Sequence, residues 1–263
     1  MLRISVRYYR PIPIDKSGYE TEIVELDAAR TALVVMHCWD IGCEGGPQID
    51  PNFWVGMGFY ENFREAERIM RECIRPAMDA ARKAGVLVCH VESAQTSRNH
   101  PEAQRDLDPP AEPPRQPRPA PPPVVPGWRE RMVARFHGED YPTKSPYARM
   151  DLAKIVAPLP GEPFVYQSGQ FDRALRRHGI ENLIYAGFAT DMCVLRAPGG
   201  IEPMAGFGYR LFLMRDATLG VECPDTFEER IATRWAIRYF ETHFGDTLLF
   251  ADFVKACEQI GEG

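Results

Sequence analysis

The chain has 263 residues, of which 44% are hydrophobic and 26% are charged, and its formal net charge at pH 7 is −6. This composition is typical of a globular protein that buries a sizeable core. The acidic balance and the lack of a lysine- and arginine-rich block argue against a nucleic-acid partner and an anionic membrane. No apolar run reaches the roughly 18 residues of a membrane-spanning helix, and the first 20 residues lack the apolar stretch of a signal peptide.

Seven cysteines are spread irregularly along the chain, at positions 38, 43, 73, 89, 193, 223 and 257. None belongs to a CxxC pair, so a zinc knuckle or a redox dithiol has no support. An odd number of irregularly spaced cysteines is typical of free thiols in a reducing compartment. We therefore expect a cytoplasmic protein with free thiols. We also expect it to hold no metal and to use no cofactor.

Residues 1–30 contain two β-prone segments, ISVRYY and TEIVEL, separated by a proline-rich break. They predict an N-terminal arm or short hairpin ahead of a main domain at 31–263, which either forms subunit contacts or packs on its own domain. The first core strand is expected at Thr31–His37, because TALVVMH is a continuous apolar run typical of a strand buried on both faces. Apolar residues then recur every three or four positions over 61–84, which predicts a long helix that is kinked or broken at Pro76.

Beyond Gly85, which should end this helix, predicted strands and helices alternate. Strands are expected at 86–92, 163–167, 181–187, 209–217 and 246–253, and helices at 172–180, from Thr190 onward, and at 226–244. Such alternation predicts right-handed βαβ crossovers and a mostly parallel sheet covered on both faces, which is an α/β fold. Ligands of these sheets bind beyond the carboxyl ends of the strands.

A proline-rich segment interrupts this pattern between the second and third core strands. Ten prolines fall within residues 109–126, which excludes a helix or an interior strand there and favours extended backbone. We predict a surface insertion at about 99–126, acting as a structural loop or a lid within the main domain. A ligand for an SH3-type domain is the alternative.

The segment GFATDMCV, residues 187–194, carries the strongest chemical signal. It follows a buried strand and opens a helix, with Thr190 as the expected N-cap and Asp191 in the first turn. Cys193 would then lie in the first helical turn, where unpaired N–H groups and the helix dipole favour a thiolate. The same N–H groups can hold an oxyanion, so the segment suits acyl transfer through a thioester. A buried cysteine that merely fills the core is the alternative.

The stretch GIENLIYAGFATDMCV resembles the nucleophile segment of the isochorismatase-like cysteine hydrolases. TALVVMHCWD is similar to the family's first strand, and GYRLFLMRDATLG to the strand and loop after the nucleophile. The resemblance covers about residues 30–255 in scattered pieces. It implies a three-layer α/β/α sandwich with a mostly parallel six-stranded sheet, a cis peptide bond at Phe188–Ala189, and homo-oligomers such as dimers or tetramers. The implied activity is hydrolysis of an amide C–N bond or, in one branch, of a vinyl ether.

The family's catalytic residues are an aspartate ending the first strand, a lysine after the third strand, and the cysteine. In this chain the aspartate position holds His37 and the lysine position falls near Gln167, whereas Cys193 matches. One hypothesis makes His37 the general base, with Asp40 orienting it. A second makes Asp40 the acid and base, with charge from Lys144. In a third, the chain has lost hydrolysis and keeps a pocket for binding.

The preferred prediction is a hydrolase that cleaves a C–N bond of a small amide-type substrate through Cys193. Backbone N–H groups of Ala189 and Cys193 would form the oxyanion site. Trp39 and Phe188 would line the pocket, unless they are ordinary core residues. The alternative function is a catalytically inactive small-molecule-binding or assembly protein on the same fold.

Two other classes of site are disfavoured. His90 and Glu92 end the second core strand and would lie near His37 if the two strands are neighbours. His37, Asp40 and His90 could in principle bind a metal, but the spacing of the family's metal motif is absent. A dinucleotide-binding fold is also disfavoured, because no GxGxxG follows the first strand.

Overall fold

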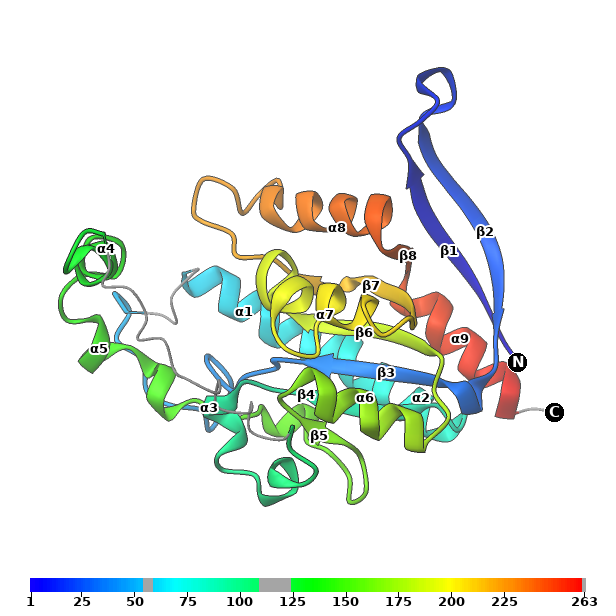
Figure 1. Cartoon of the computed structure of the whole chain (residues 1–263), viewed down its shortest axis with the longest axis horizontal. Helices are drawn as coiled ribbons and strands as arrows, with labels where there is room; N and C mark the ends of the chain where they lie inside the picture. Colours follow the sequence, from blue (N-terminus) through cyan, green and yellow to red (C-terminus); the bar gives the residue numbers. More distant parts are fainter. Residues whose placement is uncertain (54–58, 109–123, 262–263) are drawn as a thin grey trace.

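The computed structural model describes residues 1–53, 59–108 and 124–261. A single sheet runs through the protein, and helices cover both of its faces (Figure 1). Its eight strands have the order β2-β1-β8-β7-β6-β3-β4-β5. They are β1 (Leu2–Arg10), β2 (Gly18–Leu26), β3 (Thr31–Met36), β4 (Leu87–Val91), β5 (Phe164–Val165), β6 (Asn182–Phe188), β7 (Arg210–Leu219) and β8 (Gly245–Leu248).

The six strands from β8 to β5 are parallel to one another, and β1 is antiparallel to both of its neighbours, β8 and β2. The predicted α/β class and mostly parallel sheet are therefore confirmed, but the predicted total of six strands is wrong. Residues 1–30 supply the two extra strands as a hairpin that pairs with β8 and projects from the body (Figure 1). Leu2, Ile4 and Val6 are buried while their neighbours are exposed, so one face of the hairpin joins the core.

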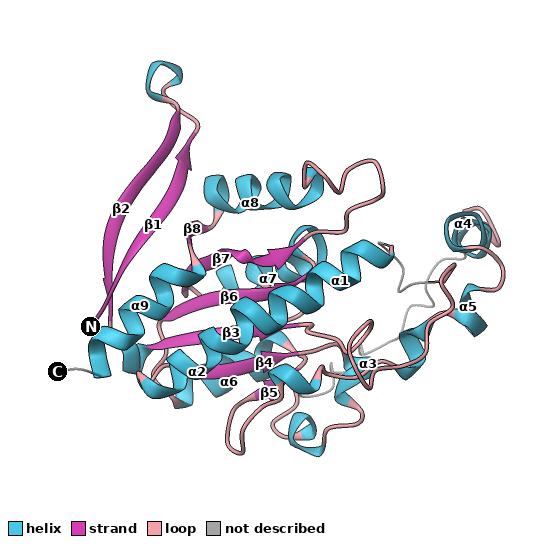
Figure 2. Cartoon of the chain, turned by 180° about the vertical axis from the view of Figure 1, so that it is seen from behind, coloured by secondary structure: helices cyan, strands magenta, loops and turns pink. Residues whose placement is uncertain are grey.

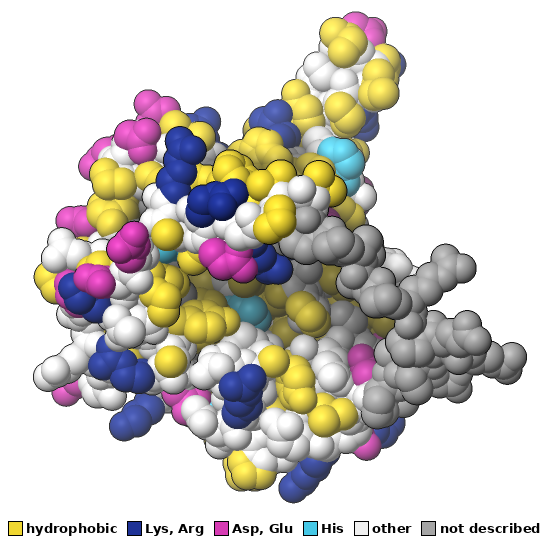
Figure 3. Space-filling model, turned by 60° about the vertical axis from the view of Figure 1, so that its left-hand side comes forward, with side chains coloured by type: hydrophobic (Ala, Val, Ile, Leu, Met, Phe, Trp, Pro, Cys, Tyr) yellow, Lys and Arg dark blue, Asp and Glu magenta, His cyan; other side chains and the backbone are white. Residues whose placement is uncertain are grey.

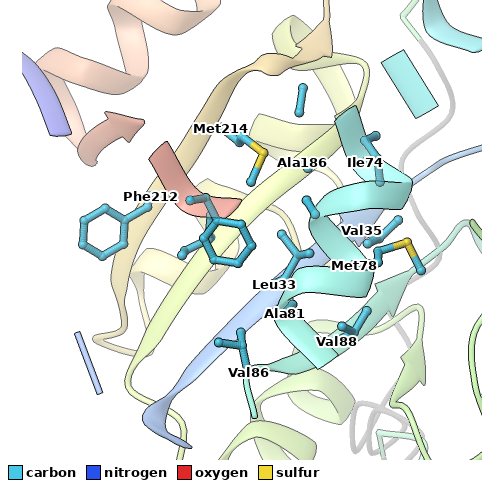
Figure 4. Close-up of a cluster of buried hydrophobic side chains, with 14 of the residues drawn as sticks. Leu33, Val35, Ile74, Met78, Ala81, Val86, Val88, Ala186, Phe212 and Met214 are labelled. Carbon is cyan, nitrogen blue, oxygen red and sulfur yellow. The ribbon is translucent and has the colours of Figure 1, made fainter. Parts of the chain in front are cut away.

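The helices form two layers. The helices α1 (Tyr60–Ile69), α2 (Arg75–Lys83) and α9 (Phe250–Gly261) cover one face, and α6 (Ser168–Arg177), α7 (Ile201–Ala205) and α8 (Ile231–His243) cover the other (Figures 1 and 2). Figure 4 shows the first layer, in which Met78 and Ala81 of α2 point toward Leu33 and Val35 of β3. Burying each large apolar side chain contributes roughly 1.5–3 kcal/mol. The strand β3 is therefore held rigidly between the two layers.

The predicted helix over 61–84 is present in three parts: α1, a π-turn at Met70–Ile74, and α2. The π-turn ends two residues before Pro76, whose nitrogen has no hydrogen to donate, and the helix widens there without breaking. Gly85, with φ of +75°, ends the helix as predicted.

The predicted strand over 246–253 is wrong beyond Leu248. Residues from Phe250 onward form the helix α9, whose start is fixed by Asp216: its Oδ1 atom accepts a hydrogen bond of 2.8 Å from the Phe250 N–H. Phe253, Ala256 and Cys257 are buried at helical spacing in the core that also holds β1. The apolar run LLF obscures this helical period in the sequence.

The remaining elements are short. They are α3 (Ala94–Ser97), α4 (Trp128–His137) and α5 (Tyr141–Lys144), with 3-10 turns at Ile14–Lys16, Ala28–Arg30, Pro101–Gln104, Pro146–Arg149 and Lys154–Val156. Most of the predicted proline-rich insertion, residues 109–123, lies outside the described residues. Within the described part of the chain, no helix combines the length and the hydrophobicity needed to cross a bilayer.

Candidate active site

The carboxyl ends of three neighbouring strands meet at one edge of the sheet. The strand β3 lies between β4 and β6, and Met36 pairs with Val91 on one side and with Gly187 on the other. The residues that follow these three are His37, Glu92 and Phe188, so they lie side by side. This is the edge at which parallel sheets bind ligands.

A cavity of about 70 Å³ lies at this edge. It is lined by Trp39, Asn62, Phe63, Ala66, Phe188, Ala189, Cys193, Leu219, Gly220 and Val221. The structure thus brings four of the predicted site residues, Trp39, Phe188, Ala189 and Cys193, around one space. Figure 3 shows a hollow on one face of the molecule, in which hydrophobic side chains and a histidine are visible.

A larger cavity, of about 720 Å³, lies at the opposite edge of the sheet. Its walls include Arg30, Asn182 and Arg210, which stand at the amino ends of the strands. Because ligands of parallel sheets bind at the carboxyl ends, the smaller cavity that contains Cys193 is the candidate active site.

Cys193 lies in a π-turn, Thr190–Val194, and not in the first turn of an α-helix. The predicted N-cap at Thr190 is wrong, because Ala189 occupies that position. The Oγ1 atom of Thr190 lies 2.7 Å from that of Thr218, which itself donates to the carbonyl oxygen of Gly187. The hydroxyl therefore joins this turn to β7, which fixes the backbone that carries Cys193.

The backbone before the turn that carries Cys193 has two unusual features. The Phe188–Ala189 peptide bond is cis, as the family resemblance implies, and Gly187 has φ of +120°. A Cβ atom at Gly187 would collide with the carbonyl oxygen of Met36. Only glycine at position 187 therefore allows β6 to approach β3 this closely.

Replacing Gly187 by alanine should lower the free energy of unfolding by about 3 kcal/mol or more, because the new methyl group collides with backbone and the φ angle disfavours it. Urea unfolding followed by circular dichroism measures this loss. Gly206→Ala is the matched control, since a Cβ there meets its nearest atom at 3.4 Å and should change stability little. Equal effects of the two substitutions would contradict the prediction.

The thiol of Cys193 is not pre-ionised. Burial raises its pKa, the backbone N–H of Ala189 opposes that rise, and the nearby carboxyl groups of Glu92 and Asp191 add to it. The resting thiol is therefore protonated at neutral pH, contrary to the thiolate expected from the sequence, because the loss of water outweighs the backbone donor. Attack by this sulfur needs a group that accepts its proton.

Glu92, which follows β4, supplies a buried carboxyl group beside the cavity. Its Oε2 atom accepts a hydrogen bond of 2.9 Å from the indole Nε1 of Trp39, and its Oε1 atom accepts one of 3.2 Å from the Cys38 N–H. Burial raises the pKa of Glu92 to about 8, although these donors oppose the rise. The group can therefore gain and lose a proton near neutrality.

His37 stands where the family has its aspartate. Its φ of +48° is in the left-handed region, a strained conformation for a residue with a side chain. Its ring stacks on Trp39 with centroids 5.2 Å apart, and neither ring nitrogen has a hydrogen-bond partner among the described residues. Burial lowers the pKa of His37 to about 4, so the imidazole is neutral at physiological pH.

Asp40, Gln167 and Lys144 point elsewhere. The Oδ1 atom of Asp40 accepts a hydrogen bond of 2.9 Å from the Asp151 N–H, which ties the loop after β3 to residue 151. Gln167 precedes α6 and accepts a hydrogen bond from the backbone N–H of Asp108. Lys144 forms an exposed ion pair with Asp140. None of the three lines the Cys193 cavity.

Comparisons with known proteins agree with this architecture. No family profile matches the chain. A cysteine hydrolase from Pseudomonas syringae superimposes with a TM-score of 0.51 at 15% sequence identity, covering 89% of this chain and 95% of the other. The chain therefore shares its fold with that cysteine hydrolase. This finding confirms the resemblance on which the fold was predicted.

Two further similarities concern proteins with named activities. The ureidoacrylate amidohydrolase RutB of Azorhizobium caulinodans is 34% identical over 116 residues, which is 41% of this chain and 47% of the relative. The matched region thus spans about half the length of that relative. An isochorismatase from Pseudomonas putida is 16% identical, with a TM-score of 0.49 over 88% of this chain and 93% of its own.

Within this fold, the described residues contain no group of three or more histidine, cysteine, aspartate or glutamate side chains able to hold a metal. His90 is paired with Glu162 at 3.2 Å, and not with His37 or Asp40. All seven cysteines are free thiols.

Sequence reasoning did not assign a role to Glu92 or Asn62. The signal for Glu92 is an acid that ends the apolar run VLVCHVE, one position beyond the pair of β4 with β3. The signal for Asn62 is a polar residue among the buried positions at the start of an amphipathic helix. Both become informative only when the neighbouring strands and helices are known.

Proposed function

We propose that the protein hydrolyses a C–N bond of a small amide-type substrate, with Cys193 as the nucleophile. The observation that carries this proposal is the half-buried Cys193 thiol on a small cavity whose wall residue Trp39 is hydrogen-bonded to the buried carboxyl group of Glu92. The partial match to a ureidoacrylate amidohydrolase supports the reaction class. The proposed site residues are Cys193, Glu92, Ala189, Trp39 and Phe188.

In the first step, the Cys193 sulfur attacks the substrate's carbonyl carbon while its proton moves to the Glu92 carboxylate. The carbonyl oxygen becomes an oxyanion, which the N–H of Ala189 stabilises; this donor already faces the sulfur closely enough to lower its pKa. The Glu92 proton then passes to the leaving nitrogen as the C–N bond breaks. An amine or ammonia departs and a thioester remains on Cys193.

In the second step, water attacks the thioester and gives a proton to Glu92. The tetrahedral intermediate expels the sulfur, which recovers its proton from Glu92. The balance is one amide and one water converted to one carboxylic acid and one amine, with thiol and carboxylate regenerated. One carboxyl group thus acts alternately as base and acid.

The pKa values favour Glu92 over His37 as the proton acceptor. Moving a proton from a thiol with a raised pKa to an imidazole of pKa about 4 is uphill by roughly 6 kcal/mol or more. The Glu92 carboxyl group, with a pKa of about 8, is a stronger base than the His37 imidazole, so transfer to Glu92 costs less than transfer to His37. The stacked and neutral His37 ring is assigned to shaping the site around Trp39.

Detection of the acyl-enzyme tests the proposal directly. The full chain is mixed with a panel of small primary amides and ureido compounds, and intact mass is followed together with ammonia release. We expect an acyl mass increment on Cys193 and release of ammonia, both absent in Cys193→Ala. Tight binding of panel members with neither product would instead support the binding protein, which the loss of the family's aspartate and lysine favours.

We also propose that the protein forms a homo-oligomer and is cytoplasmic. The hairpin formed by β1 and β2 exposes Ile12, Ile14 and Ile23, which are apolar side chains suited to a subunit contact. Light scattering on the full chain tests this: a monomer at micromolar concentration would contradict the oligomer.

A further inference from the structure

Asn62 is a buried polar residue on the wall of the Cys193 cavity. It lies in the first turn of α1 and is 9% exposed. Its Nδ2 atom donates a hydrogen bond of 3.4 Å to the carbonyl oxygen of Gly220, which lies on the same cavity. Its Oδ1 atom is buried and has no hydrogen-bond partner within the described residues.

The orientation of the Asn62 amide is fixed from behind. The Gly220 N–H donates a hydrogen bond of 2.8 Å to Oγ1 of Thr233. This hydroxyl in turn donates a hydrogen bond of 2.7 Å to the buried carboxyl group of Glu222. These bonds hold the Gly220 carbonyl in place. A flipped Asn62 amide would set two carbonyl oxygens against each other, so Oδ1 is the atom left without a partner.

Apart from the Cys193 thiol and the Ala189 N–H, the rest of the cavity wall is apolar or already hydrogen-bonded. The indole N–H of Trp39 is taken by Glu92, and Phe188, Leu219 and Val221 present hydrocarbon. No charged side chain among the described residues lines the cavity. A volume of about 70 Å³ admits only a group of a few heavy atoms. One fixed acceptor in such a pocket orients whatever enters it.

We propose that Asn62 Oδ1 accepts a hydrogen bond from a substrate N–H, so that the site selects a compact, uncharged amide or ureido group over an ester. This inference rests on the proposed function and names the group that the cavity recognises. Asn62 is a specificity-determining residue here: it forms and breaks no covalent bond. An ester of the same size leaves Oδ1 unpaired and places its own oxygen against it.

Two alkylating probes of similar size test this without requiring turnover. Iodoacetamide carries an N–H donor beside its carbonyl group, whereas methyl iodoacetate carries none. The rate of alkylation at Cys193 is measured for each probe by peptide mass spectrometry, and their ratio is divided by the ratio for glutathione. We expect a corrected preference of about tenfold for iodoacetamide in the natural protein.

The Asn62→Leu substitution should abolish this preference and leave the rate with methyl iodoacetate within about twofold. If the leucine variant fails to fold, the preference is measured in Asn62→Ser, whose short side chain cannot reach the same position. Asn99→Leu is the matched control, because Asn99 is exposed and lies outside the cavity. The proposal is overturned if the natural protein shows no preference, or if a folded Asn62 variant retains it.

The outcome separates from that of the proposed function. Alkylation requires only the thiol and the shape of the cavity, so a preference that depends on Asn62 can be observed even if no amide forms an acyl-enzyme. Conversely, the natural protein and the Asn62 variants could all form an acyl-enzyme equally well from an amide and from its ester. That result would support the hydrolase function and contradict the role of Asn62.

Discussion

Replacing Cys193 by serine is expected to lower kcat/KM for an amide substrate by about 10⁴-fold or more, a loss typical of removing a covalent nucleophile. A serine hydroxyl holds its proton far more tightly than a thiol does. The Glu92 carboxylate, whose pKa is about 8, cannot remove that proton at neutral pH. The substitution is nearly isosteric, so binding and folding should survive while turnover is lost.

The matched control is Cys223→Ser. Cys223 is an exposed free thiol that does not line the cavity, and its replacement should leave kcat/KM unchanged. Initial rates of ammonia release measure both variants, and thermal unfolding checks that each is folded. Full activity in Cys193→Ser, or an equal loss in Cys223→Ser, would remove Cys193 from the mechanism.

The strands around the site could be predicted from the sequence because each is a continuous apolar run. TALVVMH gave β3 and ENLIYAG gave β6 to within a residue or two at each end. Burial on both faces leaves no polar position to confuse the pattern. Because the strand before Cys193 is easy to recognise, the position of Cys193 could also be predicted. A reactive group after a buried strand lies at the ligand-binding edge of a parallel sheet.

Other elements were missed where two local signals compete. The segment LLFADF contains the end of the strand β8 and the start of the helix α9. Only the hydrogen bond from the Phe250 N–H to Asp216 shows where the strand gives way to the helix. Thr190 is a good N-cap in isolation, but Thr218 on the adjacent strand engages its hydroxyl. The hairpin at β1 and β2 was one of two alternatives, because a strand's neighbour cannot be read from its own residues.

The candidate site depends even more on contacts between distant residues. Glu92 is 101 positions from Cys193 in the chain, and it reaches the site because β4, β3 and β6 are adjacent in that order. Asp40 was the carboxylate nearest in sequence to the first strand, yet its side chain is bonded to the backbone of Asp151. Closeness in sequence to a strand end therefore does not show that a carboxylate faces Cys193.

Replacing Glu92 by glutamine should lower kcat/KM by about 10²–10⁴-fold, the usual contribution of a general base. Because the mechanism requires the carboxylate form, the natural protein's kcat/KM should rise with pH to a plateau, with a midpoint near the Glu92 pKa of about 8. The glutamine variant should lose this rise. If His37 were the base, its pKa of about 4 would make the rate flat between pH 6 and pH 9, which would contradict the assignment.

Stability gives an independent measure of the same carboxyl group. In the folded protein Glu92 keeps its proton up to about pH 8, whereas an unfolded glutamate releases it near pH 4.3. The folded state therefore binds more protons in this range, and the free energy of unfolding falls as pH rises. His37, whose pKa is lowered by burial to about 4, has the opposite effect only below about pH 6.5, the ordinary histidine value.

Between pH 6.5 and pH 8, His37 consequently does not oppose the effect of Glu92. The ionisation of Glu92 should lower the free energy of unfolding by roughly 2 kcal/mol over this range. Urea unfolding of the natural protein at both pH values measures the decline, and Glu92→Gln should remove it whatever the variant's absolute stability. The comparison separates two roles of the carboxyl group. A variant that loses turnover and also loses this pH dependence has lost a buried, titrating base, whereas one that loses turnover but keeps the decline has only been distorted.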